Sequence, residues 1–461
     1  MVNERLEGRL NRMRSVAVIC CLMLFGCALF EEPPSKGLIL ISLDTLRADR
    51  VGMHRAGRPL MPSVERLADD GVLFEQCYAH APSTLPSHAS IMTSLLPPHH
   101  GAYYARKSKL APGVITIAEL LSRAGYRTAS FNDGGQLAAT WGLDRGFDRY
   151  ESDVVKRETE SGGIVRDYRL ILAVKKAIGW LEEDDSRPFF VFLHSYEVHH
   201  PYTPSEADVE ALGEAALGYR KRVSVDQLRA INEGRLLVND EERRHIQDAY
   251  NAEVLSADRA VGHLVSKLKE MGLYEDTMIV FTSDHGEEFD EHGKIGWHSH
   301  SLHDELLHVP LIIKFPRGRF GETRVTTQVR SIDIAPTVLA HLGIESPPQF
   351  IGKDLSSRAD SGWQWELPVL SYQDTPEGTD YWSLREKRWK LYYDRPSDFR
   401  LYDLRNDAEA LVSQGTQPGL ANAMKKRKRA MLKERSFAVQ TTTRPAAETE
   451  ENLRALGYIV D

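Results

Sequence analysis

The chain has 461 residues, of which 42% are hydrophobic and 27% charged, so it is long enough to bury a large core in one large α/β domain or in two to three domains. Its formal net charge of −8 is modest for this length and argues against a nucleic-acid-binding surface. The one dense basic run, residues 425–429 (KKRKR), lies within a helical pattern and predicts a solvated helix face.

The N-terminus has the pattern of an export signal. Four arginines precede an apolar run that is too short for a comfortable membrane span, which is typical of a secretory signal. The run ends in Leu24-Phe25-Gly26-Cys27, which resembles the lipobox of bacterial lipoproteins. We therefore predict a signal peptide at 1–26, lipidation of Cys27 and a tether at 27–37. The protein would then be anchored to a membrane of the bacterial cell envelope, facing the periplasm or the exterior. An uncleaved anchor helix or a plain signal peptide is the alternative.

The next elements in the chain alternate between strands and helices. Apolar, β-rich runs predict four buried strands, at 38–43, 189–194, 277–282 and 309–314. Helical patterns between them lie at 63–74, 116–126 and 248–272. This alternation predicts an α/β sheet with helices on both faces.

Two segments depart from this alternation. Residues 203–245 are charged and mostly helical, and we expect them to form an insertion in a catalytic domain that spans 38–345. From 346 onward the pattern changes to short strands, a charged helix and a tail. We therefore expect residues 346–461 to form a smaller C-terminal subdomain and tail.

Polar side chains follow the predicted strands at the ends where α/β sheets place their ligands. Asp44 follows the first strand and Arg47 comes three residues later, a pairing that suits a metal ion with an anionic substrate. Asp284 and His285 follow the third strand, and oxygen and imidazole ligands side by side favour zinc or manganese over magnesium or calcium. An aspartate after a strand is also commonly a helix N-cap, so Asp44 taken alone is a weak signal.

Five motifs occur in an order that resembles the sulfatase family within the alkaline-phosphatase superfamily. They are LDTLR, TLPSHAS, HSYEVHHPY, SDHGEE and WHSHSLHDELLHVPL. The resemblance covers about residues 38–405, and ENLRALGY near the end is similar to the tail of many bacterial members. It implies a doubly wound, mixed α/β sheet with helices on both faces, a smaller C-terminal α+β subdomain, and a divalent metal that holds an esterified oxyanion.

The resemblance also implies a set of metal ligands. Asp44, Asp284 and His285 match metal ligands of the family, and Thr84 matches the nucleophile, which completes the ligand set. One divalent ion is favoured, zinc or manganese first and calcium as an alternative, and a second metal is left open.

Five further residues are carried over as catalytic or substrate-binding residues. His199 matches a histidine that contacts the substrate group, and His298 matches the family's late active-site position, with His300 as the alternative because spacing there can slip by two. His199 and His298 would bind the anion or protonate the leaving group, unless both are core histidines. Arg47 is close enough in sequence to face the anion, and His88 occupies the position of a motif arginine, so both are predicted to bind substrate.

The chain departs from the sulfatase pattern at the nucleophile. Sulfatases carry Cys or Ser in a Cys/Ser-x-Pro-x-Arg motif that is oxidised to formylglycine, whereas Thr84 and His88 stand here. Oxidised threonine would be a ketone, not an aldehyde. In addition, Thr45 replaces a second carboxylate, and ASFNDGG at 129–135 replaces a Lys-Trp-His segment.

This departure shapes the expected function. The hydrated aldehyde of sulfatases releases sulfate by collapse of a hemiacetal, which a threonine cannot do, whereas a threonine alkoxide can attack phosphorus. Nucleotide pyrophosphatase-like phosphodiesterases have a similar Thr-x-Pro-Asn-His turn. We expect a metal-dependent hydrolase of small-molecule, glycan or lipid esters of sulfate or phosphate. Thr84 favours phosphodiesters or phosphonate monoesters as substrates.

Four alternatives stay open. The protein could be a sulfuric ester hydrolase that works without formylglycine, or an envelope phosphotransferase. It could also be a non-catalytic envelope protein that binds anions. Finally, Thr84 could simply cap the helix that follows it.

Overall fold

The computed structural model describes the chain from residue 35, with internal gaps. The described residues are 35–103, 108–158, 164–183, 185–213, 222–357, 367–374, 380–395, 398–405, 410–412, 417–433, 440–441 and 447–458. Cys27 and the signal peptide predicted at 1–26 lie outside them, so the lipid anchor and the envelope location stay predictions. Among the helices that the structure describes, none combines the length and apolar character needed to cross a membrane.

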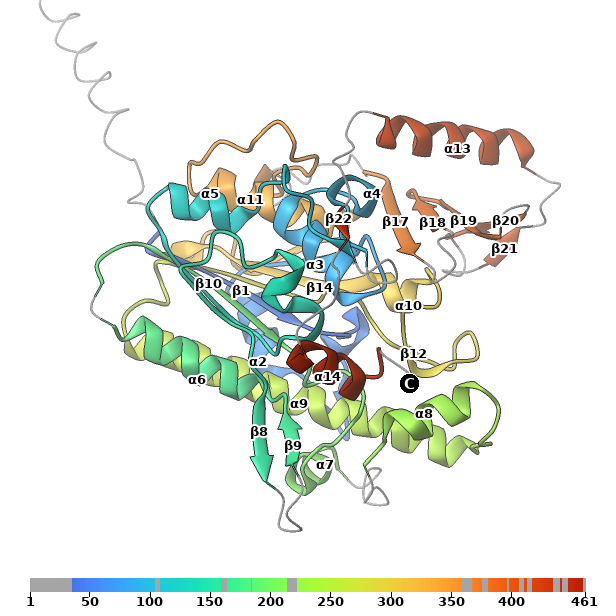
Figure 1. Ribbon diagram of the computed structural model, residues 1–461, viewed down its shortest axis with the longest axis horizontal. Helices are drawn as coiled ribbons and strands as arrows, with labels where there is room; N and C mark the ends of the chain where they lie inside the picture. Colours follow the sequence, from blue (N-terminus) through green and yellow to red (C-terminus); the bar gives the residue numbers. More distant parts are fainter. Residues whose placement is uncertain are drawn as a thin grey trace, which may run out of the picture. The chain divides into compact units, whose positions relative to one another are not determined.

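A mixed sheet forms the centre of the molecule (Figure 1). Within the described residues it has nine strands in the order β15-β4-β14-β11-β1-β10-β6-β7, with β16 also paired to β4. Strands β11, β1, β10, β6 and β7 run parallel, and β14 is antiparallel to both β11 and β4. Their bounds are β1 Gly37–Leu43, β4 Val72–Tyr78, β6 Arg127–Phe131, β7 Arg149–Glu151, β10 Phe189–Ser195, β11 Thr277–Thr282, β14 His308–Lys314, β15 Thr323–Val325 and β16 Val329–Arg330.

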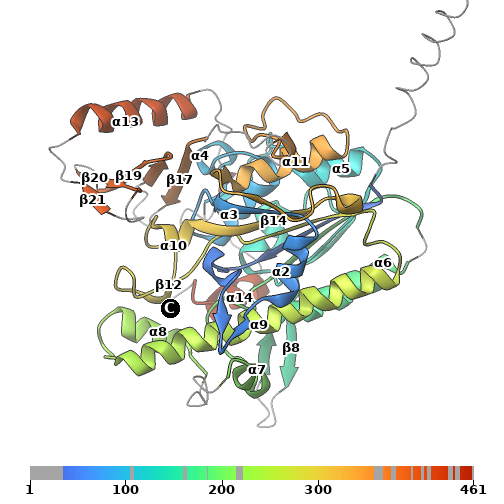
Figure 2. The same ribbon diagram turned by 180° about the vertical axis from the view of Figure 1, so that it is seen from behind.

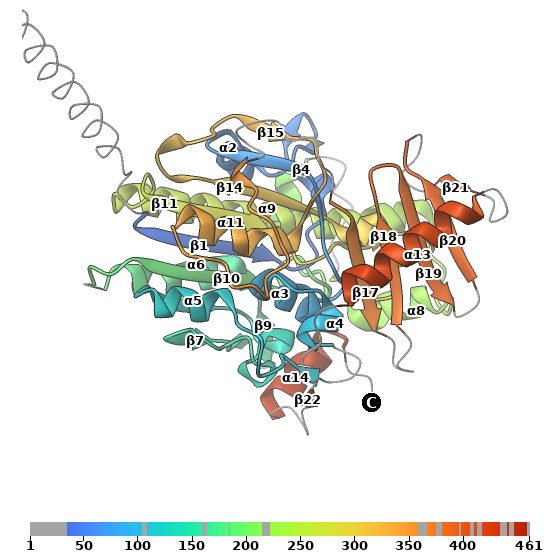
Figure 3. The same ribbon diagram turned by 90° about the horizontal axis from the view of Figure 1, so that it is seen from above.

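Helices cover both faces of this sheet, as predicted (Figure 3). Because side chains alternate along a strand, Leu38 and Leu40 of β1 pack in one apolar cluster, and Ile39 and Ile41 in another. The first cluster includes α3 (Thr84–Thr93), α5 (Ile117–Arg123) and α11 (Ile334–His341). The second includes α2 (Pro62–Asp69), α6 (Leu170–Leu181) and the long α9 (Asp240–Glu270). All three helices are labelled in Figure 2, which views the molecule from behind.

The predicted helix at 63–74 is wrong in its last turn. Helix α2 ends at Asp69, and β4 begins at Val72. Gly71 separates the two elements because it allows close contact with β14: a Cβ there would lie 2.6 Å from the carbonyl oxygen of Ile313. The other predicted strands and helices match observed elements within a few residues, although α9 begins earlier than expected, at an Asn239 capping box.

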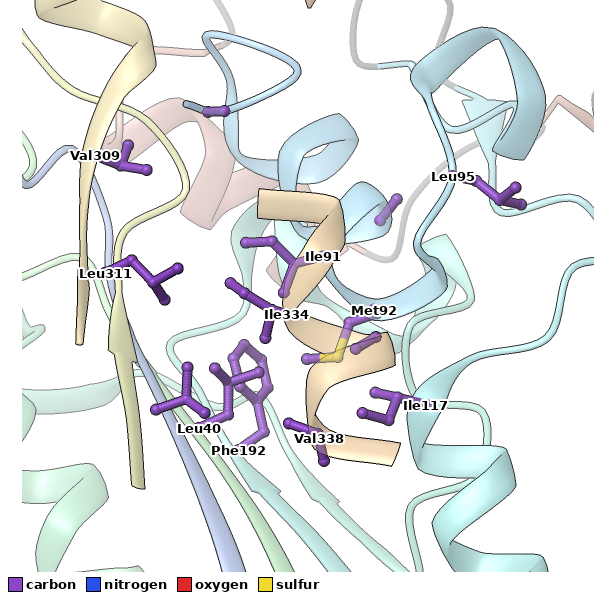
Figure 4. Packing of buried hydrophobic residues seen from close by; sticks show 14 of the residues in the cluster. Leu40, Ile91, Met92, Leu95, Ile117, Phe192, Val309, Leu311, Ile334 and Val338 are labelled. Atoms are coloured by element: carbon purple, nitrogen blue, oxygen red, sulfur yellow. The ribbon is translucent and has the colours of Figure 1, made fainter. Parts of the chain in front are cut away.

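The first cluster supplies a test of core stability (Figure 4). Leu311 of β14 is fully buried between β11 and β4. We expect Leu311→Ala to lower the free energy of unfolding by about 2–5 kcal/mol, because it leaves a cavity that the strands cannot close. Denaturant unfolding measures this, with Leu237→Ala as the control, since Leu237 is 88% exposed. An equal effect of both substitutions would contradict the observed packing.

A second, antiparallel sheet forms the predicted C-terminal subdomain. Its strands are β17 (Val369–Asp374), β18 (Asp380–Arg385), β19 (Trp389–Arg395), β20 (Asp398–Asp403) and β21 (Ala410–Val412), and it packs against α13 (Pro418–Leu432). Asp304, the first residue of α10, joins this sheet to the catalytic part: it accepts hydrogen bonds from Lys390 (2.8 Å) and Arg385 (2.6 Å).

Shorter elements complete the described chain. Two helices lie in the stretch predicted as an insertion, α7 (Glu206–Ala211) and α8 (Val225–Asn232). A C-terminal helix, α14, spans Ala447–Ala455. The others are β2 His54–Arg55, β3 Arg58–Pro59, α4 Pro97–His100, β5 Ser108–Lys109, the 3-10 turns η1 Ala48–Arg50, η2 Gly135–Leu137, η3 Ala139–Trp141, η5 Pro316–Gly318 and η6 Ser331–Asp333, β8 Val155–Glu158, β9 Ile164–Asp167, β12 Glu288–Phe289, β13 Ile295–Trp297, α10 Asp304–Leu307 and β22 Gln440–Thr441.

Candidate active site

Three neighbouring parallel strands bring the predicted site residues together. In the order β11-β1-β10, Ser42 of β1 lies opposite both Thr282 of β11 and His194 of β10. The residues that follow these positions therefore meet at one edge of the sheet. Asp44, directly after β1, and Asp284, two residues after β11, are both fully buried there.

Asp44, Asp284 and His285 form a cluster that fits a divalent metal ion. Among the described residues, Asp44 Oδ1, Asp284 Oδ2 and His285 Nε2 have no hydrogen-bond partner, although all three are buried. His285 Nε2 lies 3.8 Å from Asp44 Oδ1 and 3.5 Å from Asp284 Oδ2. The Nδ1 of His285 is 2.9 Å from the carbonyl oxygen of Gly286, to which it donates, so Nε2 presents a lone pair. Three buried lone-pair donors turned toward one another are the arrangement that a cation requires.

The charges of this cluster also call for a cation. Burial raises the pKa of Asp44 to about 6. Burial and the nearby Asp44 raise the pKa of Asp284. Burial alone would lower the pKa of His285, but Asp284 and Asp44 outweigh it and raise that pKa. Two carboxylates in a dry site repel each other, and a bound divalent ion would relieve that repulsion.

Thr84 is the first residue of α3, and its hydroxyl points into this cluster. Its Oγ1 donates to Asp44 Oδ2 at 3.0 Å and lies 3.0 Å from the hydroxyl of Tyr458. The N-cap residue is Ser83, whose side chain makes no capping hydrogen bond, and the Leu85 N–H of the first turn donates to Gln136 Oε1 rather than to Thr84. The alternative that Thr84 only caps the helix is therefore wrong. The N-terminal end of the α3 dipole is directed at the same place, where it would stabilise an anion.

The predicted catalytic histidines lie on the other side of Tyr458. His199 Nε2 is 2.9 Å and His298 Nε2 is 3.3 Å from the Tyr458 hydroxyl. Burial lowers the pKa of His298 to about 3, although Glu287 acts in the opposite direction, and burial also lowers the pKa of His199 well below its usual value. Both imidazoles are therefore neutral near pH 7. The roles predicted for them in catalysis stay predictions.

The three predicted substrate contacts have other partners. The Arg47 guanidinium binds Asp49 and Glu291 and donates to the carbonyl of Glu287. His88 lies one helical turn after Thr84, with Nδ1 2.9 Å from the Thr84 carbonyl oxygen and Nε2 2.9 Å from Ser42 Oγ. His88 thus links the first turn of α3 to β1. His300 pairs with Glu288 at 2.6 Å.

Thr45, which replaces a second carboxylate, has a left-handed backbone (φ 59°). This conformation is strained for a β-branched residue. Local contacts hold it: its Oγ1 donates to the Val198 carbonyl at 2.9 Å, its backbone N–H donates to Asp284 Oδ1, and its carbonyl accepts from Tyr250. The side chain at this position is thereby turned toward the 196–199 loop.

Four residues of the site were given no role from the sequence. His194 is 3.2 Å from Asp44 Oδ2, and Glu287 accepts from His298 Nδ1 at 3.0 Å. Gln136 accepts from the Leu85 N–H, and its Nε2 is a buried donor with no partner among the described residues. Tyr458 lies three residues after the end of α14, which is dark red in Figure 1. Motif signals existed for three of them: His194 begins HSYEVHHPY, Glu287 lies in SDHGEE and Tyr458 ends ENLRALGY.

The fold and this site define a hydrolase of oxyanion esters, in which a buried hydroxyl lies beside a cluster of metal ligands at the carboxyl edge of an α/β sheet. The chain belongs to the sulfatase family: the Sulfatase family model matches residues 36–344. A second model, N-sulphoglucosamine sulphohydrolase, C-terminal, matches residues 291–436. The family is metal-dependent, in agreement with the cluster described above.

Individual relatives are distant but cover most of the chain. An N-acetylglucosamine-6-O-sulfatase of Bacteroides thetaiotaomicron is 22% identical, over 84% of each chain. Arylsulfatase K of Xenopus laevis is 23% identical, over 88% of this chain and 84% of its own. The crystal structure of a phosphonate monoester hydrolase of Agrobacterium radiobacter has a TM-score of 0.70 at 20% identity, covering 89% of this chain and 97% of the other. The predicted family and fold are confirmed.

Proposed function

We propose that this protein hydrolyses phosphate diesters or phosphonate monoesters with Thr84 as the nucleophile. The observation that carries the proposal is the hydroxyl of Thr84. It is fully buried at the N-terminus of α3, is not used as a cap, and already donates its proton to Asp44. Zinc or manganese at Asp44, Asp284 and His285 would neutralise the substrate oxyanion and lower the pKa of the hydroxyl.

The residues of the chain suggest how the reaction would proceed. Thr84 Oγ, losing its proton to Asp44 Oδ2, attacks phosphorus as the bond from phosphorus to the ester oxygen breaks, and the departing alkoxide takes up a proton from water. The N-terminus of α3 and the buried Nε2 donor of Gln136, whose Oε1 accepts from the Leu85 N–H, would stabilise the oxyanion. A water molecule then attacks the phosphorus of the threonine ester, which releases the product and restores the hydroxyl.

Threonine decides between phosphorus and sulfur on chemical grounds. A sulfate ester of Thr84 lacks the geminal hydroxyl whose collapse would expel sulfate, so its release would need a second attack at sulfur. A phosphate ester of Thr84 is open to direct attack by water at phosphorus. The similarity in fold to a phosphonate monoester hydrolase is compatible with this preference.

Sulfate ester hydrolysis is the second candidate. It is favoured by similarity to an N-acetylglucosamine-6-O-sulfatase and to Arylsulfatase K, which both act on sulfate esters according to their names. A sulfated sugar would then be the substrate.

Paired substrates distinguish the two candidates. With added zinc or manganese, we expect kcat/KM for bis-p-nitrophenyl phosphate or a p-nitrophenyl phosphonate to exceed that for p-nitrophenyl sulfate at least about tenfold, a difference of about 1.4 kcal/mol in transition-state stabilisation. Release of p-nitrophenol measures both reactions. Faster turnover of the sulfate would contradict the proposed preference, and no turnover of any substrate would favour a transferase or a binding protein.

A further inference from the structure

The C-terminal turn brings a tyrosine hydroxyl into contact with the candidate nucleophile. Tyr458 Oη lies 3.0 Å from Thr84 Oγ1, although 374 residues of sequence separate the two side chains. Thr84 Oγ1 makes its other hydrogen bond within the described residues to Asp44 Oδ2, to which it donates. Because the proton of Thr84 is directed at Asp44, Tyr458 is the hydroxyl that can donate beside the attacking oxygen.

Packing holds this tyrosine in place. Asn452 of α14 is 4% exposed and is bonded at both ends of its amide. Its Nδ2 donates to the carbonyl of Asp133, and its Oδ1 accepts from the Tyr168 hydroxyl, both at 2.7 Å. Gly457 has a φ of 83°, and a Cβ there would lie 2.8 Å from a side chain of α8. The turn therefore presents the Tyr458 hydroxyl from a fixed position.

Several other groups that could have bound a substrate anion are engaged elsewhere. The Arg47 guanidinium is paired with two carboxylates. Both ring nitrogens of His88 have partners, and His300 is paired with Glu288. Residues 129–135 also replace the Lys-Trp-His segment of sulfatases. An anion at the nucleophile would therefore depend on the metal ion and on neutral hydrogen-bond donors.

The phosphoryl group must come to the place that the Tyr458 hydroxyl faces. Attack requires phosphorus at about 3–3.5 Å from Thr84 Oγ1. The oxygens of that group would then lie among the present neighbours of the hydroxyl, since His199 Nε2 and His298 Nε2 are 2.9 Å and 3.3 Å from Tyr458 Oη. The hydroxyl could transfer its hydrogen bond from these side chains to a phosphoryl oxygen, and a bond to an anionic oxygen is the stronger one.

We propose that Tyr458 is a catalytic residue that donates a hydrogen bond to the transferring phosphoryl group while Thr84 attacks it. This role rests on the proposed function. Tyr458 keeps its proton throughout, so no covalent bond to it forms or breaks. The hydrogen bond becomes fully formed only as phosphorus bonds to Thr84 Oγ1. Its contribution should therefore appear in kcat more than in KM.

Tyr458→Phe tests this role, because it removes the hydroxyl and keeps the ring. With zinc bound and bis-p-nitrophenyl phosphate as substrate, we expect kcat of the full-length chain to fall about 10- to 100-fold, while KM changes less than about threefold. The matched control is Tyr274→Phe. Tyr274 is 4% exposed and its hydroxyl donates to Asp70, so this variant also loses one tyrosine hydroxyl but should keep the wild-type kcat. Thermal melts confirm that both variants are folded.

A second measurement does not need turnover. Orthovanadate adopts the five-coordinate geometry that phosphorus passes through, and calorimetry gives its Kd for the zinc-loaded chain. We expect Tyr458→Phe to raise this Kd about 10- to 100-fold, because it removes a hydrogen bond to a charged group. Tyr274→Phe should leave the Kd unchanged.

The outcomes separate this role from the proposed function. Wild-type turnover with an unchanged kcat and an unchanged vanadate Kd in Tyr458→Phe would overturn the role and leave the function standing. A higher kcat/KM for Tyr458→Phe would also overturn it, because the hydroxyl would then block the site. If the wild type hydrolyses none of the esters, the function fails. Weaker vanadate binding by Tyr458→Phe would then still support the contact with the anion, and equal binding would overturn it.

Discussion

Thr84→Ala is expected to lower kcat for the phosphodiester by about 10⁴- to 10⁶-fold, because removing a nucleophile leaves only binding and oxyanion stabilisation. The hydroxyl is the atom that contacts Asp44 in the metal-ligand cluster. Thr84→Ser keeps this oxygen and loses one methyl group, so its kcat should stay within about tenfold of the wild type, which corresponds to a loss of at most about 1.4 kcal/mol in transition-state stabilisation. Steady-state release of p-nitrophenol measures both variants.

Thr93 provides a matched control for this prediction. It lies at the other end of α3, is also fully buried, and its hydroxyl donates to the carbonyl of Ala89. Thr93→Ala and Thr84→Ala should each cost about 1 kcal/mol of stability for the lost hydrogen bonds, but only Thr84→Ala should abolish turnover. Activity of Thr84→Ala within tenfold of the wild type would show that another group or a water molecule attacks the substrate.

The sheet could be predicted from the sequence because its central strands are buried on both faces. Such strands appear as continuous apolar runs, and LILISL and TMIVFT correspond to β1 and β11 almost residue for residue. The strand β4 could not be found in this way. Its residues 72–74 continue the apolar spacing of α2, and the boundary depends on the contact between Gly71 and β14, which is distant in sequence.

The candidate site was predictable to the extent that it lies at strand ends. Asp44 and Asp284 were identified because each lies within two residues of the end of a strongly apolar strand. Tyr458 could not be placed in the same way, because 374 residues separate it from Thr84 and only the packing of the C-terminal turn brings the two hydroxyls together. The direction of each imidazole lone pair was equally hidden, since it depends on Nδ1 partners such as Glu287 that only the fold supplies.

Asp284→Asn is expected to abolish metal binding at the Asp44 cluster and to lower kcat/KM by at least about 10³-fold, since an amide oxygen is a much weaker ligand than a carboxylate. The substituted side chain keeps the oxygen that accepts from the backbone of Thr45, so the fold should persist. Metal analysis and kinetics on the same preparation measure the effect. Asp258→Asn is the control, because this buried carboxylate accepts hydrogen bonds from the N–H groups of Ser63 and Val64 at the start of α2.

The thermal stability of Asp284→Asn should not fall with its activity when both proteins are metal-free. In the metal-free protein the pKa of Asp284 is raised by burial and by Asp44, so its charged form destabilises the fold near pH 7. The neutral amide that replaces this carboxylate removes the penalty, so metal-free Asp284→Asn should melt no lower than the metal-free wild type. With metal present at about 1,000 times its Kd, the wild type gains about 4 kcal/mol. For a chain of this size that gain corresponds to about 5 °C in Tm, and the variant should lack it. If chelation lowered the Tm of both proteins equally, the metal would be bound elsewhere; if it lowered neither, Asp44 and Asp284 would form a buried acidic pair without an ion.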